Sequence, residues 1–308
     1  LHGGDKLAIK LTKGYRVFQV LNYALFFLLA MLAVIPFIHL LALSLSSGRA
    51  ATSSMVSLVP VEFTMESYRY LWANQQFITS FYNSIVRIVL GVSINLIIVF
   101  ITAYPLSKEN TRFPQRTVYV WYIAFTMFFG GGLIPTYMVV KMTGLINTIW
   151  ALIIPGAVNV WNIVLMLNFF RQVPKELEES ALMDGAGQWT ILWKIFLPVS
   201  IPAIGTVLLF TMLGHWNSWF DGIIYLNKIR LYPLQTYIAS IIMDESALQQ
   251  MLLKNSSLTP EQLEQLAKLN EKTVTAAQVF LGALPVIAIY PFLQKFFVKG
   301  LIVGSVKG

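Results

Sequence analysis

Residues 81–106 read FYNSIVRIVLGVSINLIIVFITAYPL, and this stretch decides the fold class. Arg87 is its only charged residue. An apolar run of about 20 residues or more can cross the hydrocarbon core of a bilayer as an α-helix. A helix also satisfies its backbone polar groups internally, which lipid requires. The stretch therefore predicts a transmembrane helix, and Arg87, near one end, is expected to extend its charge to the membrane surface.

Five further runs have the same character. They are Val20–Leu45, Val118–Val140, Ile149–Phe170, Leu197–Phe220 and Ala276–Phe297. Of the 308 residues, 56% are hydrophobic and only 12% are charged, which is more apolar surface than a soluble domain can bury. A membrane β-barrel would instead show short alternating segments. The sequence predicts an all-α polytopic membrane protein with about six transmembrane helices, the third broken or bent at Gly130–Gly132.

Basic residues mark alternate connections between these runs, which predicts the orientation. The basic sets are Lys6, Lys10, Lys13 and Arg16; Lys108, Arg112 and Arg116; Arg171, Lys175 and Lys194; and Lys295, Lys299 and Lys307. Because basic connections stay on the cytoplasmic side, both termini are expected there. The predicted organisation is a cytoplasmic arm, 1–19, followed by a transmembrane domain, 20–308. That domain includes a cytoplasmic loop, 172–196, and an external segment, 221–275.

Several function classes are disfavoured by composition. The net charge of +8 comes from short clusters between apolar runs rather than from one face, which argues against nucleic-acid binding. The chain has no cysteine, so thiol catalysis and disulfides are excluded. His39 and His215 stand alone without carboxylates at ligand spacing, so no metal site is expected. No Gly-x-x-x-x-Gly-Lys-Ser/Thr motif occurs, so no catalytic ATPase site is expected in this chain.

The loop 172–196 carries the most informative local pattern. Pro174 suits the first turn of a helix, Glu176, Glu178 and Glu179 complement its dipole, and Gly185 permits the left-handed conformation that ends it. A second amphipathic stretch from Trp189 to Phe196 leads to Leu197-Pro198, where proline can open the next membrane helix. The pattern predicts a helix, a glycine turn and a second helix at the membrane surface.

This loop resembles the signature loop of ABC-importer permeases. It contains Glu179-Ser180-Ala181, then Gly185, nine further residues, and Ile195-Phe196-Leu197-Pro198, with Ser180 in place of an alanine. The blocks 128–137, 144–148 and 173–177 resemble the carbohydrate-uptake permeases of maltose type and their polysaccharide and alginate-oligosaccharide relatives.

The resemblance implies a type I ABC-importer permease in a bacterial plasma membrane. It implies a second homologous permease, two cytoplasmic ATPases that use ATP and Mg, and an external solute-binding protein. No cofactor is expected on this chain itself. The residues expected to couple to the ATPase are Glu179, Ser180, Ala181, Asp184, Gly185, Ile195, Leu197 and Pro198, with Glu179 as the ion-pairing residue. The alternative is a helix pair that only shields the membrane edge.

Two further sets of residues are candidates for substrate or partner contact. Amides and aromatic rings suit sugars, and the candidates for the substrate pathway are Asn159, Asn162, Trp216, Asn217 and Trp219, which could equally join helices. By the resemblance, the segment 221–275 contacts the binding protein through Leu248, Met251 and Leu263, on helices expected near Asp244 and Thr259. The alternative functions are an intramembrane lipid- or sugar-modifying enzyme and a channel or ion-coupled carrier. Both are disfavoured because the spans contain almost no Asp or Glu.

Overall fold

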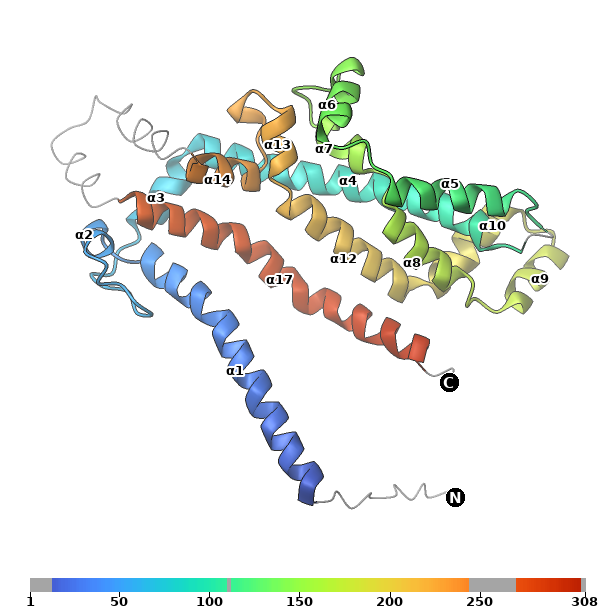
Figure 1. Cartoon of the computed structure of the whole chain (residues 1–308), viewed down its shortest axis with the longest axis horizontal. Helices are drawn as coiled ribbons and strands as arrows, with labels where there is room; N and C mark the ends of the chain where they lie inside the picture. Colours follow the sequence, from blue (N-terminus) through green and yellow to red (C-terminus); the bar gives the residue numbers. More distant parts are fainter. Residues whose placement is uncertain (1–12, 110–111, 244–269, 306–308) are drawn as a thin grey trace. The chain divides into compact units, whose positions relative to one another are not determined.

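The computed structural model describes residues 13–109, 112–243 and 270–305, with side chains as far as residue 291. Every regular element in these ranges is helical (Figure 1). The chain forms two compact units. One comprises Leu1–Tyr70 and Asn255–Phe280, and the other comprises Leu71–Lys254 and Leu281–Gly308.

The first unit is dominated by one long apolar helix. Its elements are α1 (Lys13–Ser44), α2 (Gly48–Thr52), most of α3 (Glu66–Ala73) and the start of α17 (Glu271–Ser305). A small core forms around Ala42, Ala50 and Val56, and Ser67 donates a hydrogen bond to Thr273 at 3.0 Å. Only Ala42 and Ser44 of α1 are buried. Such an all-round apolar, uncovered helix is typical of a lipid environment.

The second unit is built around the 33-residue helix α4 (Gln75–Ser107), which packs on α8 and α12. Its other elements are the end of α3, α5 (Arg116–Phe128), α6 (Leu133–Met142), α7 (Trp150–Ile153), η1 (Ile154–Gly156), α8 (Val160–Phe170), α9 (Lys175–Met183), α10 (Gln188–Ile191), η2 (Leu192–Phe196), α11 (Leu197–Val199), α12 (Ile201–Asn217), α13 (Phe220–Tyr225), η3 (Ile229–Leu231), α14 (Leu234–Met243) and the later part of α17. Its main core is made of Val99, Ala103, Ile163, Met166, Phe170, Ile191, Leu192, Phe196 and Val207, among others.

Glycine allows close approach of α4 and α12. A Cβ at Gly91 would lie 2.4 Å from the ring of His215, so no larger residue fits there without a shift. Asn95, Asn162 and Thr211 form a buried hydrogen-bonded group that joins α4, α8 and α12. Interhelical hydrogen bonds of this kind hold membrane helices together where hydrophobic burial gives no preference.

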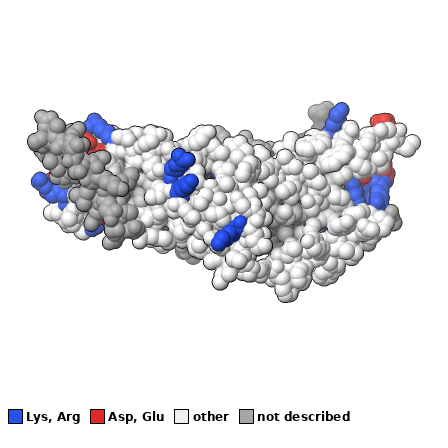
Figure 2. Space-filling model, turned by 90° about the horizontal axis from the view of Figure 1, so that it is seen from above, with Lys and Arg blue, Asp and Glu red and all other residues white. Residues whose placement is uncertain are grey.

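The helices fit the predicted membrane spans. Among the described residues, three helices are long and apolar enough to cross a bilayer alone: α1, α4 and residues Glu271–Pro291 of α17. Three bent pairs bring the total to as many as six: α5 with α6, α7–η1 with α8, and Gln188–Val199 with α12. Figure 2 shows one face of the molecule, where a broad surface carries few charged residues and mixed charges gather at the end near α9.

The break predicted at Gly130–Gly132 is confirmed. Helix α5 ends at Phe128 and α6 begins at Leu133, with an angle of 113° between them. Gly132 has a φ of +79°, a conformation that side chains disfavour and glycine adopts freely. The third predicted span is therefore two short helices rather than one.

The start of the fifth span differs from the prediction. Pro198 does not open the long membrane helix, because the chain stays helical from Gln188 to Val199 and then bends by 84°. The straight helix α12 begins at Ile201 with Pro202 in its first turn. A proline in a first turn fixes φ without removing a hydrogen bond, so both prolines satisfy the same rule and sequence could not choose between them.

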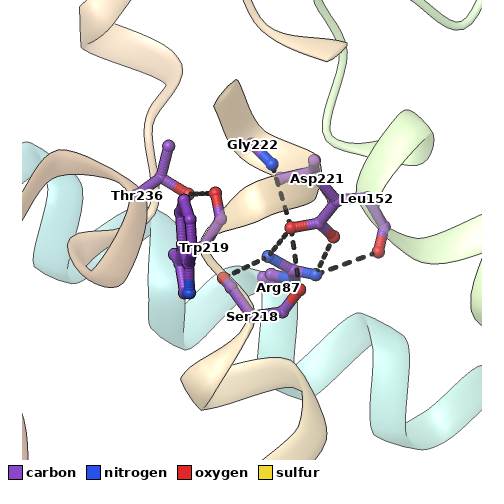
Figure 3. Close-up of polar contacts among 7 residues, drawn as sticks. All are labelled: Arg87, Leu152, Ser218, Trp219, Asp221, Gly222 and Thr236. Carbon is purple, nitrogen blue, oxygen red and sulfur yellow. Dashed lines mark hydrogen bonds and ion pairs between the residues drawn. The ribbon is translucent and has the colours of Figure 1, made fainter. Parts of the chain in front are cut away.

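The prediction for Arg87 is wrong. Its side chain is 2% exposed and does not extend to a membrane surface. The guanidinium pairs with the carboxylate of Asp221 and donates hydrogen bonds to the carbonyls of Ser218, at 3.1 Å, and Leu152, at 3.4 Å (Figure 3). The partner Asp221 lies in the first turn of α13, 134 residues later in the sequence, and its carboxylate compensates the buried charge.

Candidate functional site

Helix α9 ends in the glycine turn that the sequence predicts. Gly185 has a φ of +79°. The amide of Ala186 donates to the carbonyl of Ala181 at 2.9 Å, and the amide of Gly185 donates to that of Leu182 at 3.0 Å. This pair of bonds is the Schellman arrangement, which satisfies the last carbonyls of a helix and needs a residue with positive φ. The turn therefore has a defined shape that depends on Gly185.

The second helix of the loop runs directly into a membrane span. Residues 188–199 form α10, a π-helical stretch (η2) and α11 without a break, and the chain then bends into α12. Ile191, Leu192 and Phe196 are buried in the main core of the unit. The loop is therefore joined to α12 along the chain, across an 84° bend, and through packed side chains.

The eight predicted coupling residues divide into two groups by exposure. Glu179, Ser180, Asp184, Gly185 and Pro198 are exposed. Leu197 is buried, and Ala181 and Ile195 pack against the main core. The first group can be reached by a partner protein, and the second anchors the loop on the membrane helices. Met183 is also 88% exposed at the end of α9, which the sequence pattern does not predict.

Glu178, the residue before the predicted Glu179, is the buried carboxylate of the loop. Its Oε2 lies 2.8 Å from Nζ of Lys108, and its Oε1 lies 2.9 Å from Nη1 of Arg112. Glu179 faces outward, 3.8 Å from Arg112. From the sequence alone, Glu178 is expected only to complement the helix dipole. The sequence does contain a signal for this pairing. Lys108 and Arg112 follow one predicted span, and three glutamates lie in the loop 172–196, which is expected on the same side of the membrane.

Lys108 lies among aromatic rings as well as beside Glu178. Its Nζ is 4.0 Å from the ring centre of Tyr104 and 4.2 Å from that of Phe196. Ring faces attract a cation, which partly replaces the water it has lost. Burial lowers the pKa of Lys108, and the carboxylate of Glu178 acts against this shift. The ammonium charge therefore depends on Glu178.

A second, exposed ion pair joins the same two segments. Lys175, at the start of α9, pairs with Glu109. The pairing raises the pKa of Lys175 and lowers the pKa of Glu109. A pocket of about 430 Å³ opens beside these charges, between the end of α4 and α9. The site thus combines a buried pair, an exposed pair and a surface open to a partner.

Comparison with known proteins identifies the family of this chain. Residues 96–303, which include both ion pairs and the whole loop, match the family of binding-protein-dependent transport system inner membrane components. The chain belongs to this family.

Two relatives from Bacillus subtilis match the permease over almost its whole length. The polygalacturonan/rhamnogalacturonan transport system permease protein YtcP is 36% identical over 95% of this chain and 99% of its own. The protein LplC is 36% identical over 96% of this chain and 97% of its own. A solved structure, of a bacterial ABC transporter that imports the acidic polysaccharide alginate, contains a chain that is 33% identical, with a TM-score of 0.80 over 93% of this permease and 98% of that chain.

The predicted substrate residues of the permease do not form one cluster of free side chains. The amide of Asn162 donates to Thr211 at 3.0 Å and to Asn95 at 3.4 Å, and the ring nitrogen of Trp216 donates to Gly282 at 2.9 Å. These two side chains join helices, which was the alternative interpretation. Asn159, Asn217 and Trp219 are exposed, although Asn159 also caps α8 by accepting from the amide of Asn162. Contact with sugar stays a prediction for all five.

The described part of the segment 221–275 is attached to α4 by side chains. Gln76 donates to the carbonyl of Ile229 at 2.8 Å, and Asn83 donates to those of Arg230, at 2.9 Å, and Tyr232, at 3.2 Å. Ser84 accepts from the amide of Leu234 at 2.7 Å. The helices predicted near Asp244 and Thr259, with Leu248, Met251 and Leu263, lie outside the described residues. Within the described ranges, no group of three or more acidic residues and histidines is arranged to hold a metal ion.

Proposed function

We propose that this chain is the permease subunit of an ATP-driven importer that carries a carbohydrate, an oligosaccharide or polysaccharide fragment, into a bacterial cell. The observation that carries the proposal is similarity along almost the whole chain to a permease named for polygalacturonan and rhamnogalacturonan transport. The alginate importer supports the same substrate class, with a similar fold over 93% of this chain. An intramembrane enzyme is not favoured.

The partners follow from the same relationship. A second permease would complete the pathway, and two cytoplasmic ATPases would bind ATP and Mg, since this chain lacks the nucleotide-binding glycine loop. A solute-binding protein would deliver the sugar. One solved structure with the same fold, at 17% identity, is an alginate ABC transporter in complex with a periplasmic protein that holds an alginate pentasaccharide. Leu248, Met251 and Leu263 are the residues proposed to meet the binding protein.

The loop 172–196 is proposed to convert ATPase closure into helix movement. Glu179, Ser180, Asp184 and Gly185 present an exposed turn of defined shape to an ATPase cleft. Ala181, Ile195 and Leu197 hold the loop on the core, so a displaced loop moves the helices with it. Rigid-body movement of packed helices is a common form of conformational switching. Asn159, Asn217 and Trp219 are the candidates best exposed for contact with a sugar.

Reconstituted transport tests this function. The chain, its second permease, the ATPases and the binding protein from the same locus are placed in vesicles with ATP and Mg. We expect ATP-dependent uptake of oligosaccharides that requires the binding protein. Fragments of polygalacturonan and alginate are tested first, with raffinose as a neutral comparison. Uptake of none of them by an assembled complex would overturn the assignment to carbohydrate.

The proposed orientation has a separate test, because the chain contains no cysteine of its own. Single cysteines are introduced at Glu62 and Gln188, both of which are exposed. An impermeant thiol reagent should label the Glu62→Cys variant in intact cells and should label Gln188→Cys only after lysis. Labelling of Gln188→Cys in intact cells would contradict a cytoplasmic loop.

A further inference from the structure

Two neighbouring glutamates of α9 have opposite environments. Successive residues of a helix are turned by about 100°, so one can face the core while the next faces outward. The side chain of Glu178 is 9% exposed and that of Glu179 is 59% exposed. The two therefore cannot do the same task, although their chemistry is identical.

The buried glutamate joins three elements of the second unit. Glu178 belongs to α9, and its partner Lys108 directly follows the last residue of α4. The ammonium group of Lys108 lies over Phe196, the last residue of η2, and over Tyr104 of α4. Tyr104 also donates to Gln188, the first residue of α10, at 2.6 Å. Both helices of the loop are thus attached to one end of α4.

We propose that Glu178 is a positioning residue that fixes the coupling loop to α4 through Lys108 and Arg112, so that α4 moves with the loop when the ATPases close. This inference rests on the proposed function. A charged pair is suited to the role because both side chains are about nine-tenths buried, and separating them would leave a charge without its partner. Movement of α9 is therefore easier with α4 than away from it.

The ion pairing of Glu178 with Lys108 and Arg112 matters for the rest of the molecule because of what the other end of α4 contacts. The same helix holds Ile229, Arg230, Tyr232 and Leu234 of the segment 221–275 through Gln76, Asn83 and Ser84. A 33-residue helix is about 50 Å long, because each residue adds about 1.5 Å. One rigid element thus connects the loop proposed to meet the ATPase with the segment proposed to meet the binding protein.

The test compares Glu178→Gln with Glu176→Gln in the complete reconstituted transporter. Glu176 lies in the same helix and is exposed, so it is a matched control. The readouts are ATP hydrolysed, solute imported and the ratio of the two. We expect Glu178→Gln to reduce uptake at least tenfold while hydrolysis falls much less, which raises the ATP used per solute at least fivefold. Glu176→Gln should keep the wild-type ratio.

A second variant separates this role from simple misfolding. Lys108→Met with Glu178→Met removes both charges and leaves apolar side chains that can pack on Tyr104 and Phe196. The single variants Lys108→Met and Glu178→Met each leave one charge without its partner. We expect the double variant to recover at least half of the uptake lost in either of them, because it leaves neither charge of this pair alone. The proposal would be overturned if Glu178→Gln kept the wild-type ratio of ATP hydrolysed to solute imported, whether both rates stayed normal or both fell equally. If the wild-type complex imports no carbohydrate, the proposed function fails instead, and that result is distinguishable.

Discussion

Two buried ion pairs lie along α4, and they differ in how they are held. Arg87 pairs with Asp221, whose carboxylate also accepts from the hydroxyl of Ser218 at 2.8 Å and the amide of Gly222 at 2.9 Å. Lys108 pairs with Glu178 beside aromatic rings and an open pocket. The first pair is enclosed by hydrogen bonds with Ser218 and Gly222, around the start of α13, and with the carbonyl of Leu152 in α7. The second pair joins two segments, the end of α4 and helix α9, beside a pocket that opens to the surface.

This difference matches the chemistry of the two cations. Arginine offers several donors in a fixed plane and can bind a carboxylate and backbone carbonyls together. Lysine is a compact charge on a flexible chain, which suits a joint between segments that move. The Arg87 pair is therefore interpreted as a lock that stabilises the fold, and the Lys108 pair as a joint that transmits movement.

The largest expected effect comes from breaking the lock. Arg87→Met should strand the carboxylate of Asp221 and remove the bonds to Leu152 and Ser218. Losing one partner of a buried pair costs about 3–5 kcal/mol. We expect a strongly lowered thermal unfolding temperature of the purified protein and a low yield. Arg87→Met with Asp221→Asn should recover part of the loss. An unchanged unfolding temperature in Arg87→Met would show that this pair is no lock.

The next largest effect is expected at Gly185, in the turn that ends α9. Gly185→Val forces a β-branched residue to a φ of +79°, which strains the turn by about 1–3 kcal/mol. Uptake should be abolished while the protein still inserts and associates with the second permease. Gly185→Asn is the control, since asparagine tolerates this conformation. Equal uptake by the Val variant and the wild type would mean that the shape of the turn is unimportant.

At the far part of α4, Asn83 tests whether that helix also serves the segment 221–275. Asn83→Leu removes two hydrogen bonds to the segment, each worth about 1 kcal/mol. We expect basal ATP hydrolysis to be unchanged and its stimulation by the loaded binding protein to fall several-fold. Thr79→Val, which alters only a bond within α4, is a control. Full stimulation in Asn83→Leu would restrict the role of α4 to the loop end.

The smallest effect is expected at the exposed pair beside the joint. Glu109→Gln removes the partner of Lys175, but both side chains are more than half exposed. Exposed ion pairs contribute little because water and salt screen them. Uptake should change less than about twofold, and the unfolding temperature should not shift measurably. A loss as large as that of Glu178→Gln would remove the distinction between the buried pair and the exposed one.

The sequence alone determined the class of this protein and the form of its loop. In lipid, a long apolar run such as 81–106 satisfies its backbone N–H and C=O groups by forming a helix. The order of a proline, acidic residues and a glycine sets where α9 begins and ends. These are local properties, because helix period, capping and positive φ depend on neighbouring residues. The break after Phe128 followed from the glycines for the same reason.

Only the tertiary structure decided which polar residues are paired, because a pair is a property of two distant segments. Arg87 looked like a residue that reaches the membrane surface until Asp221, 134 positions later, was found beside it. Glu178 and Glu179 are equivalent in sequence, yet packing against Lys108 buries only the first. Asn162 and Trp216 looked suited to sugars, but Thr211 and Gly282 occupy their donors. Hydropathy and helix period report burial along one helix, whereas the position of a charge partner depends on how the helices pack.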